Sequence, residues 1–262
     1  MCASHAAGSP QTLHLLSDGL KLWAELYRPD GKAERLPALV VCHGIPGAPP
    51  DPRDRGYPAL AERLCRDGFL TLLLNFRGAG QSEGNFDILG WTRDLGVALD
   101  HLSTLEGLDR RRLSVLGFSG GAAVAIYVAA HDQRITSVVS AASPARFKAI
   151  SGARGMADLL EHSRRVKIIK DKDFPASFEE WSHGFDVVSP ADWVGRISPR
   201  PLLILHGDQD AMVPVSQSRE LYQRAGEPKD LRVLPGIGHR LRLEEKAMAI
   251  ARDWLRKTNG LH

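Results

Sequence analysis

The stretch LSVLGFSGGAAVA, residues 113–125, contains an apolar run, a glycine-rich turn and a series of small residues, in that order. It belongs to a longer segment, Leu113–Ala130, whose 18 residues carry no charge, which is near the minimum length for a membrane-spanning helix. The glycines in the middle of this segment favour another interpretation. We predict a buried strand, a tight turn and a small-residue helix, and no membrane span.

The turn has the pattern G-x-S-x-G, here Gly117-Phe118-Ser119-Gly120-Gly121. Between a strand and a helix this pattern is typical of a nucleophile elbow, in which a strained turn exposes the serine hydroxyl. The residues two before and two after the serine must be very small, and both are glycine. Ser119 is therefore the predicted nucleophile, although a glycine-rich turn can match the pattern by chance.

Apolar runs and helical patterns alternate along the rest of the chain. The runs predicted to be strands are 13–16, 22–27, 38–42, 69–75, 113–117, 136–140, 202–206 and 231–234. The predicted helices are 57–66, 91–105, 121–130, 216–225 and 243–256. This alternation predicts a mostly parallel sheet covered on both faces. The first two runs have no helix between them, so they predict an antiparallel hairpin at one edge.

A second G-x-S-x-G occurs at Gly80–Gly84 and is expected to be a chance match. It follows its strand only after a loop, and the residues after it do not begin a helix convincingly. Glu83 would also place a negative charge beside the oxyanion that forms on the substrate, which opposes catalysis. Ser82 is therefore not expected to be a nucleophile.

A nucleophilic serine needs a base, and in this order of motifs an acid and then a histidine follow the serine along the chain. The segment His206–Asp210 follows a predicted strand and offers two acids, Asp208 and Asp210. Two histidines remain beyond it. His262 ends the chain, so His239, in a glycine-rich loop after the last predicted strand, is the expected base.

The negative charge that develops on the substrate needs backbone N–H donors. One is expected from Gly120, the residue after the nucleophile. The other is expected from Ile45, in the loop His43–Gly47 after the third predicted strand, because Pro46 has no N–H. His43 is expected to shape this loop and to take no part in the chemistry.

Together these segments resemble the α/β-hydrolase superfamily of serine hydrolases, from about Leu20 to Leu255. The matching motifs are the oxyanion loop His43-Gly44, the N-x-R-G-x-G-x-S loop Asn75–Ser82, the elbow Gly117–Gly121, the H-G-x-x-D-x-x-V-P segment His206–Pro214 and the pair Gly238-His239. In the family pattern the acid is the second carboxylate of that segment. The resemblance therefore assigns the acid to Asp210 and gives Asp208 a loop-stabilising role.

The resemblance implies an α/β-hydrolase fold, with a mostly parallel eight-stranded sheet, helices on both faces and a short cap insertion. The likeness is greatest to small carboxylesterases and serine-peptidase-like hydrolases, including cinnamoyl and feruloyl esterases. It implies cleavage of a small-molecule carboxylic ester through an acyl-enzyme, with no metal and no organic cofactor. The alternatives are an aminopeptidase or amidase, or a thioesterase, with the same Ser-His-Asp triad, and a non-catalytic binding module with this fold.

The 262 residues are predicted to form one domain, residues 13–262, after a flexible arm, residues 1–12, with a cap insertion at about 143–199. A net charge of +3 gives no reason to expect a nucleic-acid partner. Three cysteines without a CxxC pair indicate neither a disulfide framework nor a zinc site. The first residues lack the apolar segment of a signal peptide, so a cytoplasmic location is expected, whereas the oligomeric state is left open.

The insertion is basic between residues 146 and 172, with eight lysines and arginines against three acids. A solvated helix face is the ordinary interpretation of such a run. A more specific hypothesis is that some of these charges, such as Arg164 and Arg165, face the cleft and favour substrates with an anionic group.

Overall fold

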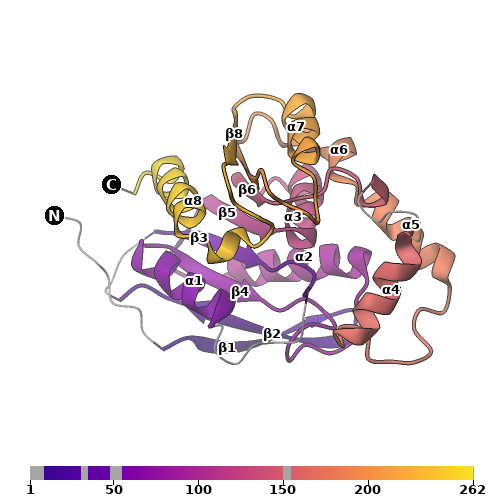
Figure 1. Cartoon of the computed structure of the whole chain (residues 1–262). Helices are drawn as coiled ribbons and strands as arrows, with labels where there is room; N and C mark the ends of the chain where they lie inside the picture. The colour runs from indigo at the N-terminus through magenta and orange to yellow at the C-terminus, as the bar shows by residue number, and fades with distance from the viewer. Residues whose placement is uncertain (1–8, 31–34, 48–54, 150–154, 262) are drawn as a thin grey trace.

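The computed structural model describes residues 9–30, 35–47, 55–149 and 155–261, which form an eight-stranded sheet between helices (Figure 1). The strands lie in the order β1-β2-β4-β3-β5-β6-β7-β8. They are β1 (Gln11–Ser17), β2 (Leu20–Tyr27), β3 (Leu36–Cys42), β4 (Leu70–Leu74), β5 (Leu108–Phe118), β6 (Ser137–Ala141), β7 (Leu202–Gly207) and β8 (Lys229–Leu234). β2 pairs antiparallel with both β1 and β4, and the other neighbouring pairs are parallel. The predicted α/β-hydrolase architecture and its edge hairpin are confirmed.

The first strand begins earlier than the sequence pattern indicated. The predicted arm, residues 1–12, is wrong at its C-terminal end, because Gln11 and Thr12 already pair with β2. Both side chains are exposed, so the strand starts before its apolar pattern does at Leu13. Main-chain pairing at a sheet edge does not require buried side chains, which is why composition did not show it. Residues 1–8 lie outside the described residues.

Two layers of helices cover the sheet. On one face pack α1 (Gly56–Arg66) and α8 (Glu245–Thr258), and on the other pack α2 (Ile88–Thr104), α3 (Gly120–His131) and α7 (Val215–Arg224). Strand β3 shows why both faces need cover, since Val40 and Cys42 belong to the core beside α2 and α3, whereas Leu39 and Val41 belong to the core beside α1 and α8. Successive side chains of a strand point to opposite faces, so an unbroken apolar strand is buried on both.

The described part of the segment 143–199, between β6 and β7, contains three α-helices. They are α4 (Gly155–Arg165), α5 (Phe178–Val187) and α6 (Pro190–Trp193), and the first two lie to the right of the sheet in Figure 1. Trp181 of α5 donates a hydrogen bond from Nε1 to the Phe86 carbonyl oxygen at 2.9 Å, and its ring packs against Phe185. Phe86 lies in the loop between β4 and α2, so these buried aromatic side chains join the insertion to that loop.

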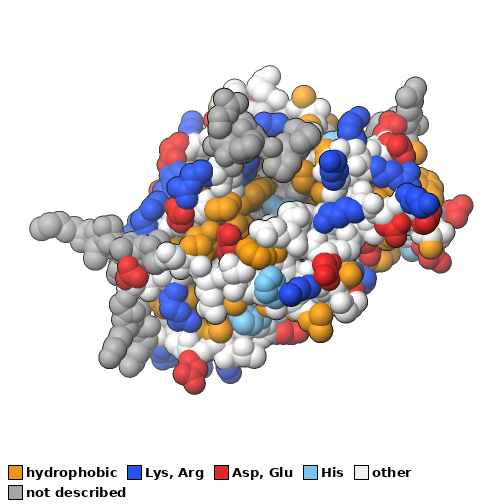
Figure 2. All heavy atoms as spheres, turned by 90° about the horizontal axis from the view of Figure 1, so that it is seen from below, with side chains coloured by type: hydrophobic (Ala, Val, Ile, Leu, Met, Phe, Trp, Pro, Cys, Tyr) orange, Lys and Arg blue, Asp and Glu red, His pale blue; other side chains and the backbone are white. Residues whose placement is uncertain are grey.

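Further expectations concern a membrane span, the cysteines and the surface charge. The charge-free segment Leu113–Ala130 is divided between β5 and α3, as predicted, and no helix within the described ranges is long and apolar enough to cross a membrane. Cys42 and Cys65 are buried and form no disulfide, while Cys2 and His262 lie outside the described residues. On the face seen in Figure 2, basic and acidic side chains of the described residues are interspersed and form no continuous field of one sign.

Candidate active site

Ser119 lies on the turn between β5 and α3, in a backbone conformation that residues with a side chain rarely adopt (φ +51°, ψ −121°). The glycines of the motif make this turn possible. A Cβ atom at Gly117 would lie 2.5 Å from the backbone of α3, and one at Gly121 would lie 2.2 Å from the His43 carbonyl oxygen. Such local strain persists where the surrounding structure enforces it, and it is common at functional sites.

The structure brings Ser119, Asp210 and His239 together from loops that follow β5, β7 and β8. His239 Nε2 lies 3.1 Å from Ser119 Oγ, and His239 Nδ1 lies 2.7 Å from Asp210 Oδ2. Because the carboxylate accepts the Nδ1–H, the other ring nitrogen is free to accept the serine proton. The other acid of this segment, Asp208, has a different partner, because its Oδ1 accepts the Gly236 N–H at 2.7 Å. Its carboxylate thus stabilises the loop after β8.

The Asp210 carboxylate is buried and surrounded by donors. Oδ1 accepts the N–H groups of Met212 and Val213 at 2.9 and 2.8 Å, while Oδ2 faces His239 and, at 3.3 Å, His206 Nε2. Burial alone would raise the pKa of Asp210, but the hydrogen bonds from His206, His239 and Val213 outweigh it and hold the pKa well below its usual range. The carboxylate is therefore ionised whenever His239 takes up a proton.

His206 supports the site, although the sequence motifs indicate no role for its side chain. It is fully buried near the end of β7, its Nε2–H donates to the Val213 carbonyl oxygen at 2.8 Å, and its Nδ1 is hydrogen-bonded to Ser218 Oγ on α7. The same Nε2–H points at Asp210 Oδ2. The H-G-x-x-D pattern contains this histidine, but the pattern alone does not reveal that its ring turns back onto the acid four residues later.

Ile45 and Gly120, the two expected oxyanion donors, lie side by side. A Cβ atom at Gly120 would be 3.1 Å from Ile45 Cγ1 and 3.8 Å from the Ile45 nitrogen. His43 is fixed by the main chain at both ring nitrogens, since Nδ1–H donates to the Gly44 carbonyl oxygen at 2.8 Å and Nε2 accepts the Phe76 N–H at 3.1 Å. Burial lowers the pKa of His43, which favours the neutral ring. These contacts fit a residue that shapes the loop.

A cavity of about 800 Å³ opens beside Ser119 and His239. Its apolar lining residues include Ile45, Pro46, Tyr57, Phe118, Met212 and Leu241, and its polar ones include Asn75, His162, Arg240 and Arg242. Within the described part of the chain, no group of three histidine, cysteine or acidic side chains is arranged to hold a metal ion.

The basic side chains proposed to face the cleft have other partners. Arg164 pairs with Glu161 at 2.7 Å and donates to a main-chain oxygen at 3.1 Å, and Arg165 donates to His162 Nδ1 at 2.9 Å. Among these cap residues, it is His162 that lines the cavity. The structure therefore does not bring Arg164 and Arg165 to the cavity wall.

The second G-x-S-x-G lies in the loop between β4 and α2. Ser82 is 1% exposed, and its hydroxyl donates to the Asn75 carbonyl oxygen at 2.5 Å and accepts the Trp23 N–H at 2.9 Å. The Glu83 carboxylate accepts the Lys21 N–H at 2.8 Å. Both side chains thus fasten the loop to the β1–β2 hairpin, and Ser82 has no histidine among its hydrogen-bond partners in the described structure.

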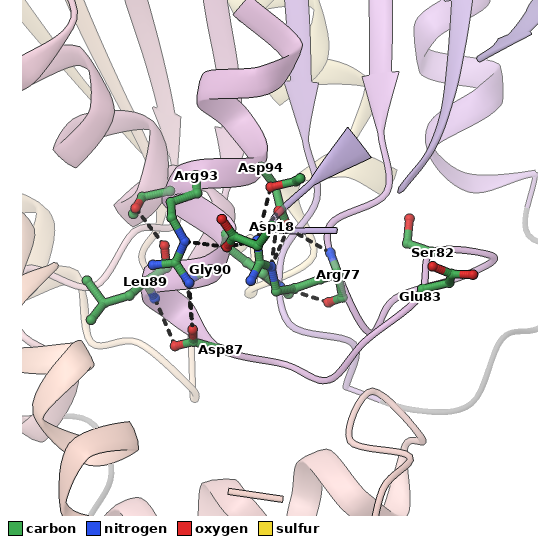
Figure 3. Close-up of polar contacts among 12 residues, drawn as sticks. Asp18, Arg77, Ser82, Glu83, Asp87, Leu89, Gly90, Arg93 and Asp94 are labelled. Carbon is green, nitrogen blue, oxygen red and sulfur yellow. Dashed lines mark hydrogen bonds and ion pairs between the residues drawn. The ribbon is translucent and has the colours of Figure 1, made fainter. Parts of the chain in front are cut away.

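An ion-pair network around Arg77 holds the first part of the same loop. Arg77 pairs with the fully buried Asp94 of α2 at 2.7 Å and with the half-exposed Asp18 at 2.9 Å. Figure 3 shows the Arg77 side chain between these two carboxylates, with Ser82 and Glu83 further along the loop and outside the network. The loop therefore connects α2 and the edge hairpin.

The sheet order, the strained elbow and the Ser119–His239–Asp210 arrangement define the class of the protein as an α/β-hydrolase. The BD-FAE family profile matches residues 24–225, so the chain belongs to the BD-FAE family of this class.

Individual proteins are also similar to this chain. An uncharacterized protein of Mycobacterium tuberculosis is 32% identical over 227 residues, which cover 85% of this chain and 69% of that protein. The esterase LipC of the same organism is 25% identical over 223 residues, which cover 81% of this chain and 55% of LipC. The structure of Est1E from Butyrivibrio proteoclasticus with bound ferulic acid superposes with a TM-score of 0.72 at 22% identity, over 94% of this chain and 96% of that one.

Proposed function

We propose that this protein is a carboxylesterase that works through an acyl-enzyme on Ser119. The observation that carries the proposal is the continuous hydrogen-bonded chain from Ser119 Oγ through His239 to Asp210, at the wall of a cavity of about 800 Å³. Membership of an α/β-hydrolase family and a relative that is an esterase support the class of reaction. A partly apolar cavity of this size suits the acyl or alcohol part of a small ester.

Acylation follows from the geometry of the three side chains. His239 Nε2 takes the proton of Ser119 Oγ as the oxygen attacks the ester carbonyl carbon. The ionised Asp210 holds the ring in the required tautomer and stabilises its positive charge. The N–H groups of Ile45 and Gly120 are directed at the oxyanion of the tetrahedral intermediate. His239 then gives its proton to the leaving alcohol, and the acyl group remains on Ser119.

Deacylation uses the same groups in reverse. A water molecule replaces the alcohol, His239 removes its proton, and the resulting hydroxide attacks the acyl carbon. The second tetrahedral intermediate is stabilised by the same two N–H groups. It collapses to release the carboxylic acid as His239 returns its proton to Ser119 Oγ. No additional side chain is needed for the proton transfers.

The test combines labelling with matched substrates. A fluorophosphonate probe should label Ser119 in the wild type, as identified by peptide mass spectrometry, and leave Ser82 unlabelled. The kcat/KM values of an ester, a thioester and an amide with one acyl group should be greatest for the ester. Preference for the amide or thioester would replace the proposed substrate class, and failure of the probe to label Ser119 would favour a non-catalytic binding module.

A further inference from the structure

The loop that carries the Ile45 donor is held by side chains. Among the described residues, no main-chain to main-chain hydrogen bond involves Gly44, Ile45 or Pro46. The Gly44 N–H donates to Tyr57 Oη on α1 at 3.2 Å, and the Gly44 carbonyl oxygen accepts from His43. A further hydrogen bond reaches the loop from the insertion, at Pro46, on the other side of Ile45 from Gly44.

That contact is made by His162, a half-buried residue near the end of α4. Its Nε2 lies 2.7 Å from the Pro46 carbonyl oxygen, and its Nδ1 lies 2.9 Å from an Arg165 guanidinium nitrogen. A carbonyl can only accept and a guanidinium can only donate, so Nε2 carries the hydrogen and Nδ1 accepts. Both nitrogens of His162 are thus engaged, and it is no second base for Ser119 although it lines the same cavity.

The hydrogen bond to Pro46 also constrains Ile45. The proline ring fixes φ of Pro46, and the residue before a proline is restricted to extended conformations. Anchoring the Pro46 carbonyl group at one end and Gly44 at the other therefore leaves the Ile45 N–H little freedom to turn. A donor held in place before the reaction stabilises an oxyanion more than one that must be ordered during it.

We propose that His162 is a positioning residue, through which the cap insertion holds the Ile45 N–H in the oxyanion hole. This role rests on the proposed function, because it requires an oxyanion formed by attack of Ser119. It is distinct from substrate binding, since His162 acts on the main chain of the loop. The insertion is then part of the machinery that stabilises the transition state, besides being a wall of the cavity.

Three variants separate this role from simple packing. His162→Phe keeps a ring and loses the donor, whereas His162→Gln places an amide donor near the position of Nε2. His183→Phe is the matched control, because His183 belongs to the same insertion and its side chain is 71% exposed. Thermal unfolding and circular dichroism establish that each variant is folded before activity is compared.

Two measurements report on the oxyanion hole directly. One is the single-turnover acylation rate constant with a 4-nitrophenyl ester, and the other is the affinity for a trifluoromethyl ketone. Ser119 Oγ adds to the ketone carbon, its proton passes to His239, and the ketone oxygen becomes an oxyanion. In His162→Phe the acylation rate constant and the ketone affinity should each fall by at least about tenfold, because displacing an oxyanion donor lowers the rate by at least this factor. KM should change little.

The outcomes are distinguishable. His162→Gln should recover most of the acylation rate and of the ketone affinity, and His183→Phe should behave as the wild type. A rise in KM in His162→Phe, with unchanged acylation and ketone affinity, would overturn the positioning role and leave the proposed function intact. Absence of any acyl-enzyme on Ser119 in the wild type would overturn the proposed function and this role together.

Discussion

Ser119 and Ser82 both stand at the centre of a G-x-S-x-G in a loop that follows a buried strand, yet their hydroxyl groups have opposite surroundings. The Ser82 hydroxyl is buried and is occupied by two main-chain groups, one as donor and one as acceptor. The Ser119 hydroxyl faces a histidine and a cavity from a strained backbone conformation. The pattern of residues does not distinguish a structural serine from a nucleophilic one, whereas the partners of the oxygen do.

The largest expected effect lies on the acid side of the Ser119 site. Asp210→Asn removes the charge that fixes and stabilises the His239 ring, so kcat/KM should fall by about 10³–10⁴-fold. Asp208→Asn is the matched control, because Asp208 binds the main chain of a neighbouring loop, and it should retain kcat/KM within a few-fold. Steady-state kinetics on both folded variants provides the check. Equal losses would show that the two acids do not differ in the way that their contacts indicate.

The pH dependence of the Ser119 site should show a single acidic ionisation. The pKa of Asp210 is held well below its usual range and burial lowers the pKa of His43, so Asp210 stays ionised and the neutral ring of His43 is favoured around neutral pH. A plot of log kcat/KM against pH should therefore rise with a slope of about one on its acid side. The lowered pKa of Asp210 also stabilises the folded state at pH values above about 3.9, the pKa of an aspartate in the unfolded chain. This stabilisation is lost only as the pH falls from that value towards the lower pKa of the folded state. A slope near two, in protein that remains folded, would contradict this account.

The Ser82 loop should respond through stability. Asp94→Asn leaves the buried Arg77 with the half-exposed Asp18 as its remaining carboxylate, so the free energy of unfolding should fall by about 3 kcal/mol. Asp100→Asn on the same helix should cost less than about 1 kcal/mol, because its ion pair with Arg134 is exposed. Urea unfolding measures both, and a smaller effect in Asp94→Asn than in Asp100→Asn would exclude the structural role given to the network.

The smallest expected effect is that of Ser82→Ala. It leaves the Trp23 N–H and the Asn75 carbonyl group without their buried partner, so the free energy of unfolding should fall by about 1–2 kcal/mol, while kcat/KM stays within a few-fold. Ser103→Ala is a suitable control, since that hydroxyl donates within its own helix and accepts a long, part-buried hydrogen bond from Arg134 at 3.3 Å, so its loss should cost less than about 0.5 kcal/mol. Loss of turnover in folded Ser82→Ala would mean that the two motifs were assigned the wrong way round.

Much of the fold follows from local patterns in the sequence. The apolar runs predict the eight strands, most clearly β3, β4, β6 and β7, whose residues are buried on both faces of the sheet. Gly117 and Gly121 mark the elbow because a side chain there would collide with α3 or the His43 main chain. The pairing of Gln11 could not be predicted in this way, since an exposed edge strand has no apolar periodicity at its start.

The supporting residues of the site were less predictable than its central ones. Ser119 and His239 follow from the types of the motif residues and their order along the chain, whereas the choice of Asp210 over Asp208 follows from the resemblance to the α/β-hydrolase pattern. His206 and His162 act through contacts with Asp210 and with the Pro46 carbonyl group, which depend on how loops fold back in space. Arg77 likewise gains its partners from two distant elements. Such tertiary hydrogen bonds leave no periodic signal in a single sequence.

Burst-phase acylation tests the difference between the two serines most directly. Wild type, Ser119→Ala and Ser82→Ala, each confirmed to be folded, are mixed with excess 4-nitrophenyl ester, and the covalent adduct is located by mass spectrometry of the quenched protein. The account predicts an acyl adduct on Ser119 in the wild type and in Ser82→Ala, and no adduct in Ser119→Ala. Where deacylation limits turnover, the first two proteins should also release a burst of about one phenolate per site. An acyl adduct formed by Ser119→Ala, or its loss in Ser82→Ala, would contradict it.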